Sequence, residues 1–252
     1  MPPTVVVTAS SGTLPGLVDA LRRVPLPVEE HPLLSFAPPL DWRPLDQALD
    51  AVARYDAVAL TSPRAARALA ERWQPRRGGE LSLPPVWAGG PGTVVALADL
   101  LSDVHTPPTE EVGERGSARA LAAAMLQAGV RGPVLFPCGE IRREELTTRL
   151  QHEGIEVEEI VCYRSVLAGE TAARAAAERA GILVVASPSV ADLLARTCPP
   201  AVRPALVTVG PTTAASARAS GWAPDAVASR PTVEALVAAV RSLIGPEQGI
   251  GE

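Results

Sequence analysis

The chain has 252 residues, of which 47% are hydrophobic and 20% are charged, and its formal net charge at pH 7 is −5. This length suits one large domain or two smaller ones, and the negative charge, with only 3% aromatic residues, argues against nucleic-acid binding. Arginine supplies every basic side chain other than histidine, which excludes a lysine Schiff base and a lysine-containing phosphate loop.

Apolar runs of strand length alternate with helical patterns from the N-terminus onward. In chain order, the expected strands are residues 4–8, 57–61, 86–89, 133–137, 182–187 and 205–209. The expected helices are residues 14–23, 63–73, 93–101, 118–127, 142–152, 188–195 and 233–243. Continuous apolar strands separated by helices are typical of parallel sheets buried on both faces, so the predicted fold class is α/β.

Two further stretches, residues 32–36 and 157–166, are long enough for strands but differ from the others. The second mixes apolar and charged positions in VEEIVCYRSV. We expect these two stretches to form a two-stranded connector that is exposed on one side. The last segment, residues 245–252, is expected to be disordered.

A pair of turns recurs in the two halves of the chain. Ser62-Pro63 is followed by Gly90-Pro91, and Ser187-Pro188 is followed by Gly210-Pro211. A serine N-cap, a proline at the first helical position and free backbone N–H groups can together form an anion site. In parallel sheets, ligands bind at the carboxyl ends of the strands, where these turns fall. The repeat therefore suggests two related α/β units with a ligand cleft, although each turn alone could be a simple helix cap.

The remaining residue patterns argue against other classes of protein. No window approaches the ~20 apolar residues of a membrane helix, and the first ten residues lack the basic segment of a signal peptide. Cys138, Cys162 and Cys198 are odd in number and have no CxxC spacing, which disfavours a disulfide framework and a zinc site. We therefore expect a cytoplasmic protein without a metal site, in which Cys138 is a buried apolar residue.

Five segments carry a resemblance to a known family. They are HPLLSF (31–36), ALTSPRAARAL (59–69), LFPCGEIRREELTTRLQHEGIEVEEIVCYRS (135–165), VVASPS (184–189) and TVGPTTAASARASGW (208–222). In this order and spacing they resemble uroporphyrinogen III synthases. The resemblance implies two parallel-sheet α/β domains joined by a two-stranded β connector, with the chain crossing twice. The implied boundaries are 1–34 plus 168–252 for the first domain, 38–160 for the second, and 31–37 and 157–167 for the connector strands.

The resemblance also implies an activity. Uroporphyrinogen III synthases close the linear tetrapyrrole hydroxymethylbilane, with loss of water and inversion of the last pyrrole ring, to give uroporphyrinogen III. The family needs no cofactor, and a monomer is the expected state. The substrate carries acetate and propionate groups, which the helix starts predicted above are suited to bind.

The resemblance assigns roles to particular residues. Tyr163 is the expected catalytic residue, assisting loss of the hydroxyl; a structural tyrosine bonded to the backbone is the alternative. The expected substrate-binding residues are Thr61, Ser62, Thr93, Ser187, Ser189, Gly210, Thr212 and Thr213. Arg64 is added to them because it follows Pro63 and could reach an acetate or propionate in a bidentate manner. For the hydroxyl residues the alternative is helix capping, and for Arg64 it is a solvated position on the helix face. Arg142 and Arg143 could likewise bind substrate or lie solvated on a helix face. Arg143 matches a basic position of the family, and for it a stabilising pair with a nearby glutamate is a further alternative.

The expected partner is the bilane, and the enzyme that produces it is a further candidate. Neither a nucleic acid nor a membrane is an expected partner. A two-domain protein that binds or senses a small anion is the main alternative function, because the same turns would serve it. A Rossmann-type transferase or oxidoreductase is the second alternative. The sequence GPGT at residues 90–93 does not match the GxGxxG fingerprint of dinucleotide binding.

Overall fold

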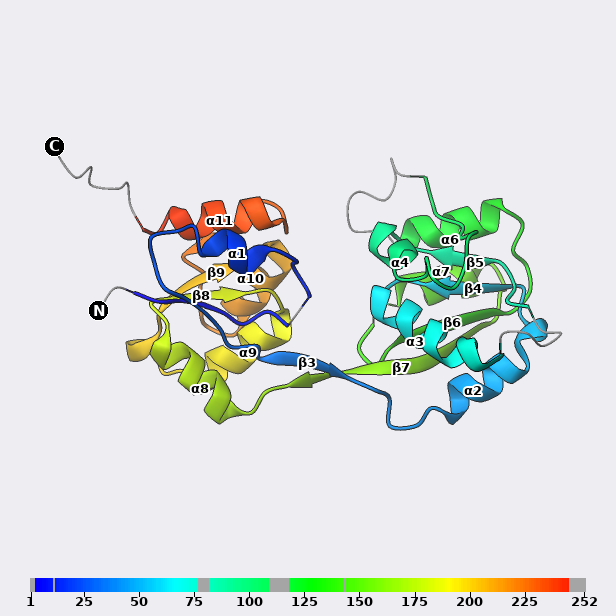
Figure 1. The fold of residues 1–252 in the computed structure, drawn as a ribbon, viewed down its shortest axis with the longest axis horizontal. Helices are drawn as coiled ribbons and strands as arrows, with labels where there is room; N and C mark the ends of the chain where they lie inside the picture. The colour runs from blue at the N-terminus through cyan, green and yellow to red at the C-terminus, as the bar shows by residue number, and fades with distance from the viewer. Residues whose placement is uncertain (1–2, 11, 77–81, 109–117, 143, 245–252) are drawn as a thin grey trace. The chain divides into compact units, whose positions relative to one another are not determined.

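The computed structural model describes residues 3–10, 12–76, 82–108, 118–142 and 144–244. The chain forms two compact units (Figure 1), which we call unit 1 (Met1–Ser35 with Val166–Glu252) and unit 2 (Phe36–Ser165). The chain passes from one unit to the other within β3 (Leu34–Ala37) and returns within β7 (Val157–Leu167).

Unit 1 is built on a five-stranded sheet in the order β10-β9-β8-β1-β2, in which each adjacent pair is parallel. Its strands are β1 (Val5–Val7), β2 (Val28–Glu30), β8 (Ile182–Val185), β9 (Ala205–Thr208) and β10 (Ala226–Val227). Counted along the unit's own strands, this is the order 2-1-3-4-5 of flavodoxin-like sheets. Such sheets bind ligands where the winding direction switches, which here is between β1 and β8.

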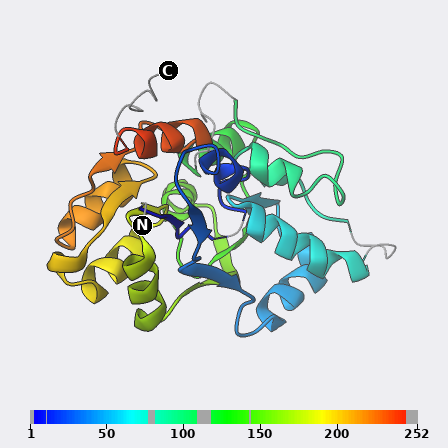
Figure 2. The same cartoon turned by 60° about the vertical axis from the view of Figure 1, so that its left-hand side comes forward.

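Helices cover both faces of the unit 1 sheet. Val5 and Val7 pack with α1 (Leu17–Leu21) and α11 (Val233–Arg241) on one face. Val6, between them in sequence, faces the opposite side, where the helices are α8 (Glu170–Arg179), α9 (Pro188–Thr197) and α10 (Pro211–Ala219). Figure 2 shows these three helices in sequence order, from yellow-green to orange. Alternating apolar residues on a parallel strand thus supply two cores.

Unit 2 has a sheet in the order β3-β7-β6-β4-β5, in which β4–β5, β4–β6 and β6–β7 are parallel. Its remaining strands are β4 (Ala57–Leu60), β5 (Val86–Ala88) and β6 (Val134–Gly139). From β5 to β7 the order is 2-1-3-4, as in unit 1, and the winding direction switches between β4 and β6. The internal repeat expected from the turns is therefore a repeat of topology.

The helices of unit 2 also lie on both faces. One core cluster joins the sheet to α2 (Arg43–Asp50) and α3 (Pro63–Trp73), and the other joins it to α6 (Ala118–Gln127) and α7 (Glu145–His152). The short α4 (Pro91–Val95) follows β5. Three 3₁₀ turns complete the described elements: η1 (Val52–Arg54), η2 (Gln74–Arg76) and η4 (Pro200–Val202).

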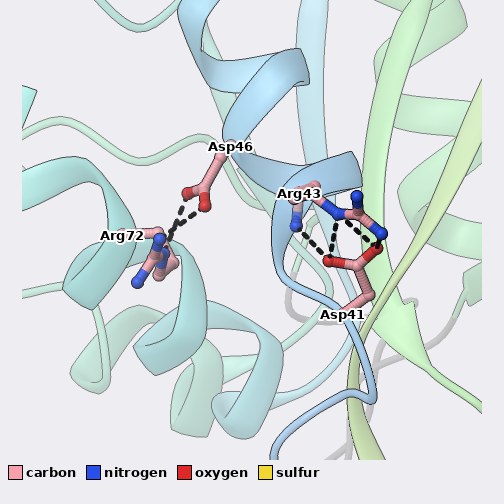
Figure 3. A network of polar contacts seen from close by, with 4 residues as sticks. All are labelled: Asp41, Arg43, Asp46 and Arg72. Atoms are coloured by element: carbon pink, nitrogen blue, oxygen red, sulfur yellow. Dashed lines mark hydrogen bonds and ion pairs between the residues drawn. The ribbon is translucent and has the colours of Figure 1, made fainter.

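Two ion pairs involve α2 (Figure 3). One holds α2 against α3, and the other lies at the start of α2. Arg72 of α3 donates from Nε to Asp46 of α2 at 2.9 Å, and its guanidinium lies 5.3 Å from the centre of the Trp42 ring. Asp41 accepts a bond of 2.9 Å from the backbone N–H of Arg43 at the start of α2 and also pairs with the Arg43 side chain. Forked arginine–carboxylate pairs fix geometry, so the first of these pairs joins the C-terminal end of α3 to α2.

The structure confirms the α/β class with parallel sheets and corrects several elements. The helix expected at 14–23 spans only Leu17–Leu21, because Gly16 before it has a φ of 80°. The helix expected at 93–101 is α4, Pro91–Val95, and the one expected at 142–152 begins at Glu145. The patterns missed α2, α8, β2 and β10. Strand β7 does more than connect, because it pairs with β6 from Val157 to Tyr163.

Three expectations stay predictions. The first is the set of domain boundaries with their connector strands. The second is disorder of the segment 245–252, which lies outside the described residues. The third is the cellular location. In the described part of the chain, no helix is long and apolar enough to cross a bilayer.

Candidate active site

The turn between β4 and α3 is the first part of the site in unit 2. The buried strand stops at Leu60, and Ser62 takes the extended conformation of an N-cap, with φ −144° and ψ 145°. Its Oγ accepts a hydrogen bond of 3.1 Å from the backbone N–H of Ala65. Capping therefore uses one lone pair of Ser62 Oγ and leaves its hydroxyl proton for a ligand. Thr61, just before it, is exposed.

Arg64 is the second residue of α3 and is only partly exposed. Its guanidinium carbon lies 3.4 Å from the centre of the Phe36 ring, a close cation–π contact. It has no acidic partner in the described part of the chain. Burial lowers the pKa of Arg64 from its ordinary value; nearby Tyr163 opposes this shift and Arg67 adds to it. An arginine stays charged even so, so a partly desolvated cation without a counter-ion lies at this strand end.

Tyr163 completes the cluster from β7. Its ring meets Phe36 edge to face, with centroids 6.0 Å apart and an interplanar angle of 67°. The side chain packs against the core cluster of α2 and α3 and is partly buried. Its Oη makes no hydrogen bond to any described residue. The alternative of a structural tyrosine bonded to the backbone is therefore not what the structure has, and the hydroxyl can serve a ligand.

Thr93 lies in the first turn of α4, next to the Ser62 turn. The two turns are adjacent because Gly89 N–H donates to the Leu60 carbonyl at 2.8 Å. Thr93 is 3% exposed, and its hydroxyl has no hydrogen-bond partner among the described residues. Since α4 has only five residues, it contributes little helix dipole. The hydroxyl, rather than the helix start, is what this turn offers.

Unit 1 has its own pair of turns, after β8 and β9. Ser187 is the N-cap of α9 but does not cap it; its Oγ lies 2.9 Å from that of Ser189 instead. The first N–H groups of α9 thus lack a side-chain acceptor. The second turn is adjacent, because Val209 N–H donates to the Val185 carbonyl at 3.0 Å.

Gly210 and two threonines form the start of α10. Gly210 has extended backbone, with φ 168°, and a Cβ there would meet nothing within 4 Å. Neither strain nor packing requires glycine here, which leaves close approach of a ligand as a reason for it. Thr212 is exposed, and Thr213 is 3% exposed. Thr208, at the end of β9, has a buried Oγ1 without a partner among the described residues.

The expected site residues therefore fall into two groups. Unit 2 brings Arg64 and Tyr163 together around Phe36, and Thr61, Ser62 and Thr93 lie on its two adjacent turns. Unit 1 carries the other group, which consists of Ser187, Ser189, Gly210, Thr212 and Thr213. Phe36 was missed by sequence reasoning, although the segment HPLLSF contains one of only two phenylalanines in the chain.

Several other polar residues have structural roles. Arg142 pairs with Glu159, which also accepts from Thr147. Arg143, for which a glutamate partner was expected as the alternative, lies outside the described residues. Burial raises the pKa of the Cys138 thiol to about 11 and that of Cys162 to about 12. Neither is a ready nucleophile. Within the described ranges no group of three or more His, Cys, Asp or Glu could hold a metal ion.

The comparison with known families decides what these turns belong to. A family model described as uroporphyrinogen-III synthase HemD matches residues 16–238. The chain belongs to the uroporphyrinogen III synthase family. The resemblance carried by the five sequence segments is thus confirmed, and the two alternative functions are not favoured.

Other members of the uroporphyrinogen III synthase family are similar in sequence or fold. The uroporphyrinogen-III synthase of Synechococcus elongatus is 29% identical over 164 residues, 64% of this chain but only 60% of that protein. The synthase of Helicobacter pylori 26695 has a TM-score of 0.63 at 19% identity, covering 96% of this chain and 99% of its own. A mutant synthase of Thermus thermophilus also scores 0.63, at 16% identity, covering 96% and 98%. These two structures show the shared fold.

Proposed function

We propose that this member of the family acts as a hydro-lyase that converts hydroxymethylbilane into uroporphyrinogen III. The carrying observation is the Phe36–Arg64–Tyr163 cluster. It places the Arg64 guanidinium near the Tyr163 phenol at the carboxyl edge of a parallel sheet. Among the described residues, the arginine has no acidic partner and the phenol has no hydrogen-bond partner. Membership of the family supports the reaction, and the cluster supports a place for it.

Arg64 would bind one carboxylate of the bilane. Its guanidinium carbon lies 3.4 Å from the centre of the Phe36 ring, and the planar fork of guanidinium N–H groups fits two carboxylate oxygens. A bound carboxylate would also supply the counter-ion that the partly buried cation lacks among the described residues. The acetate and propionate groups of the bilane are ligands of this kind.

Tyr163 would act on the reacting end of the substrate. Loss of water breaks the bond between the terminal methylene carbon and its hydroxyl oxygen. That oxygen leaves with both bonding electrons and gains a proton, and the pyrrole is left as an azafulvenium cation. A phenol O–H that donates to the departing oxygen favours this step, and Oη is free to do so because no described residue accepts from it.

The hydroxyls and backbone N–H groups of the other turns would hold the remaining carboxylates. In unit 2 these are Thr61, Ser62 and Thr93; in unit 1 they are Ser187, Ser189, Gly210, Thr212 and Thr213. Holding a flexible chain in one reactive conformation is itself a large contribution to rate. Ring inversion needs such control, since it requires the terminal carbon to meet a substituted position of the last ring.

The test is an isomer assay. Hydroxymethylbilane is generated in place, the purified protein is added, and the oxidised products are separated by chromatography. The bilane closes without an enzyme to the uninverted type I isomer, so protein-dependent type III product is the expected result. Folded protein that yields type I alone, yet binds the bilane, would support the anion-binding alternative. Cytoplasmic location, a monomeric state and contact with the enzyme that produces the bilane remain predictions.

A further inference from the structure

The pairing of β6 with β7 is irregular beside Tyr163. Partners advance one residue at a time from Val134↔Val157 to Cys138↔Val161, but the next pair is Gly139↔Tyr163. Strand β7 therefore carries one extra residue, Cys162, at this point. Such a β-bulge bends its strand and changes the direction of the following side chain, and bulges are frequent next to functional sites.

The bulge changes which face Tyr163 occupies. In a regular strand, successive side chains lie on opposite faces of the sheet. Here Cys162 and Tyr163 both pack against the core cluster that contains Leu60 and Ala65. That face also carries α3, from which Arg64 reaches Phe36. The extra residue thus brings the tyrosine to the arginine's side of the sheet.

The tyrosine ring occupies the space that a side chain at position 139 would need. A Cβ on Gly139 would lie 2.6 Å from Cζ, 2.8 Å from Oη and 2.9 Å from Cε2 of Tyr163. Backbone conformation does not require glycine here, because residue 139 is not among the glycines with positive φ. The two backbones are also joined, since Glu140 N–H donates to the Tyr163 carbonyl at 3.0 Å. Any side chain at 139 must therefore displace the ring.

We propose that Gly139, with the bulge at Cys162, is a positioning residue that sets where the Tyr163 hydroxyl lies. The consequence for catalysis rests on the proposed function, whereas the placement of the ring rests on the geometry alone. The atoms that would clash are at the far end of a side chain that can rotate and is partly exposed. A methyl group at 139 therefore moves the hydroxyl while leaving the fold intact.

The variant Gly139→Ala tests this in the isomer assay. A displacement of about 1 Å at a reacting group can lower turnover by up to about a hundredfold. We expect kcat for type III product to fall by about ten- to a hundredfold with KM little changed. In a chain that already carries Tyr163→Phe, the same change should lower kcat no further, because the hydroxyl through which Gly139 acts is absent.

Gly132→Ala is the matched control. Gly132 precedes the other end of β6, and a Cβ there would lie 2.9 Å from Cβ of Asp56. Asp56 Oδ2 accepts from the N–H groups of Arg131 and Gly132 at 2.8 and 2.9 Å, so this clash breaks hydrogen bonds. We expect Gly132→Ala to lower Tm while kcat per folded molecule is unchanged. Gly139→Ala is expected to lower kcat while Tm is nearly unchanged.

A spectroscopic measurement separates the placement from the activity. The chain has only two tyrosines, Tyr55 and Tyr163, so protein labelled with ¹³C at tyrosine Cζ gives two signals. Gly139→Ala should shift the Tyr163 signal and leave that of Tyr55, whose Oη donates to Glu158 at 2.7 Å. An unmoved Tyr163 signal overturns the placement, and an unchanged kcat overturns the positioning role. Wild-type protein without type III product would overturn the proposed function instead.

Thermal stability supplies a further measurement should Gly139→Ala fold poorly. If the methyl group clashes with the ring, Tyr163→Ala removes the obstacle, and Gly139→Ala should then cost little Tm. A loss of Tm that is the same with and without the ring would place the clash elsewhere and overturn the proposal.

Discussion

Replacing Arg64 by methionine should separate substrate binding from stability. Methionine keeps an unbranched apolar stem but removes the guanidinium that lies 3.4 Å from the Phe36 ring centre and has no acidic partner among the described residues. A hydrogen bond to a charged group is worth about 1.5–3 kcal/mol. If Arg64 binds a carboxylate of the bilane, KM should rise about 10- to 150-fold, since ~1.4 kcal/mol corresponds to a factor of ten.

The same change should leave the free energy of unfolding nearly constant. Loss of the cation–π contact costs about 0.5–2 kcal/mol, and removal of a partly desolvated charge without a counter-ion offsets it. We expect a net change within about 1 kcal/mol, measured by urea unfolding. Arg67→Met is the control, because Arg67 is exposed one turn further along α3. An unchanged KM for Arg64→Met, or equal effects of the two variants, would refute the reasoning.

Three further predictions concern stability. Arg203 donates hydrogen bonds of 2.5–3.0 Å to carbonyls at the ends of α9 and α10, so Arg203→Met should lower the free energy of unfolding by about 2–4 kcal/mol. Urea unfolding measures this change, and a loss below about 0.5 kcal/mol would contradict the prediction. Hydrogen bonds from Arg179 and then His31 lower the pKa of Glu29 to about 2, so ionised Glu29 stabilises the fold above its ordinary pKa of 4.5, and this stabilisation is lost as pH falls towards 2. Glu29→Gln should therefore make Tm less dependent on pH over that range, and a dependence of Tm on pH equal to that of the wild type would contradict this. Ser62→Ala should lower stability by about 1 kcal/mol because Ser62 caps α3, and Ser187→Ala should lower it less because Ser187 makes no cap bond. Thermal unfolding of the two variants measures this, and equal losses of stability would contradict it.

The elements that the sequence predicted well have strong local signals. Helix α3 was expected at the residues it occupies, Pro63–Trp73, because Ser62-Pro63 starts a helix unambiguously after a buried apolar strand. Helix α8 was missed because it buries only alanines, which give almost no amphipathic pattern. Strands β2 and β10 have three and two residues, too few for a periodicity to show.

The candidate site was only partly predictable. Tyr163 was named from the family resemblance and Arg64 from its place after Pro63, but their meeting around Phe36 depends on three segments distant in sequence. Strand β3 has to lie beside β7, and a one-residue bulge has to turn Tyr163 to the face of α3. Gly139 gave no signal of its own, because its backbone is ordinary and its meaning lies in the ring that fills its side-chain space. Such contacts follow from tertiary packing, which local patterns do not contain.

Turnover of Tyr163→Phe at saturating bilane tests the central claim most directly. The claim is that the free Tyr163 hydroxyl assists loss of water at the Phe36–Arg64–Tyr163 cluster. Phenylalanine keeps the edge-to-face contact with Phe36 and removes only Oη. The account predicts that type III formation slows by at least about tenfold, as for loss of a proton donor, while bilane affinity changes little. A variant that makes type III product at the wild-type rate would contradict it.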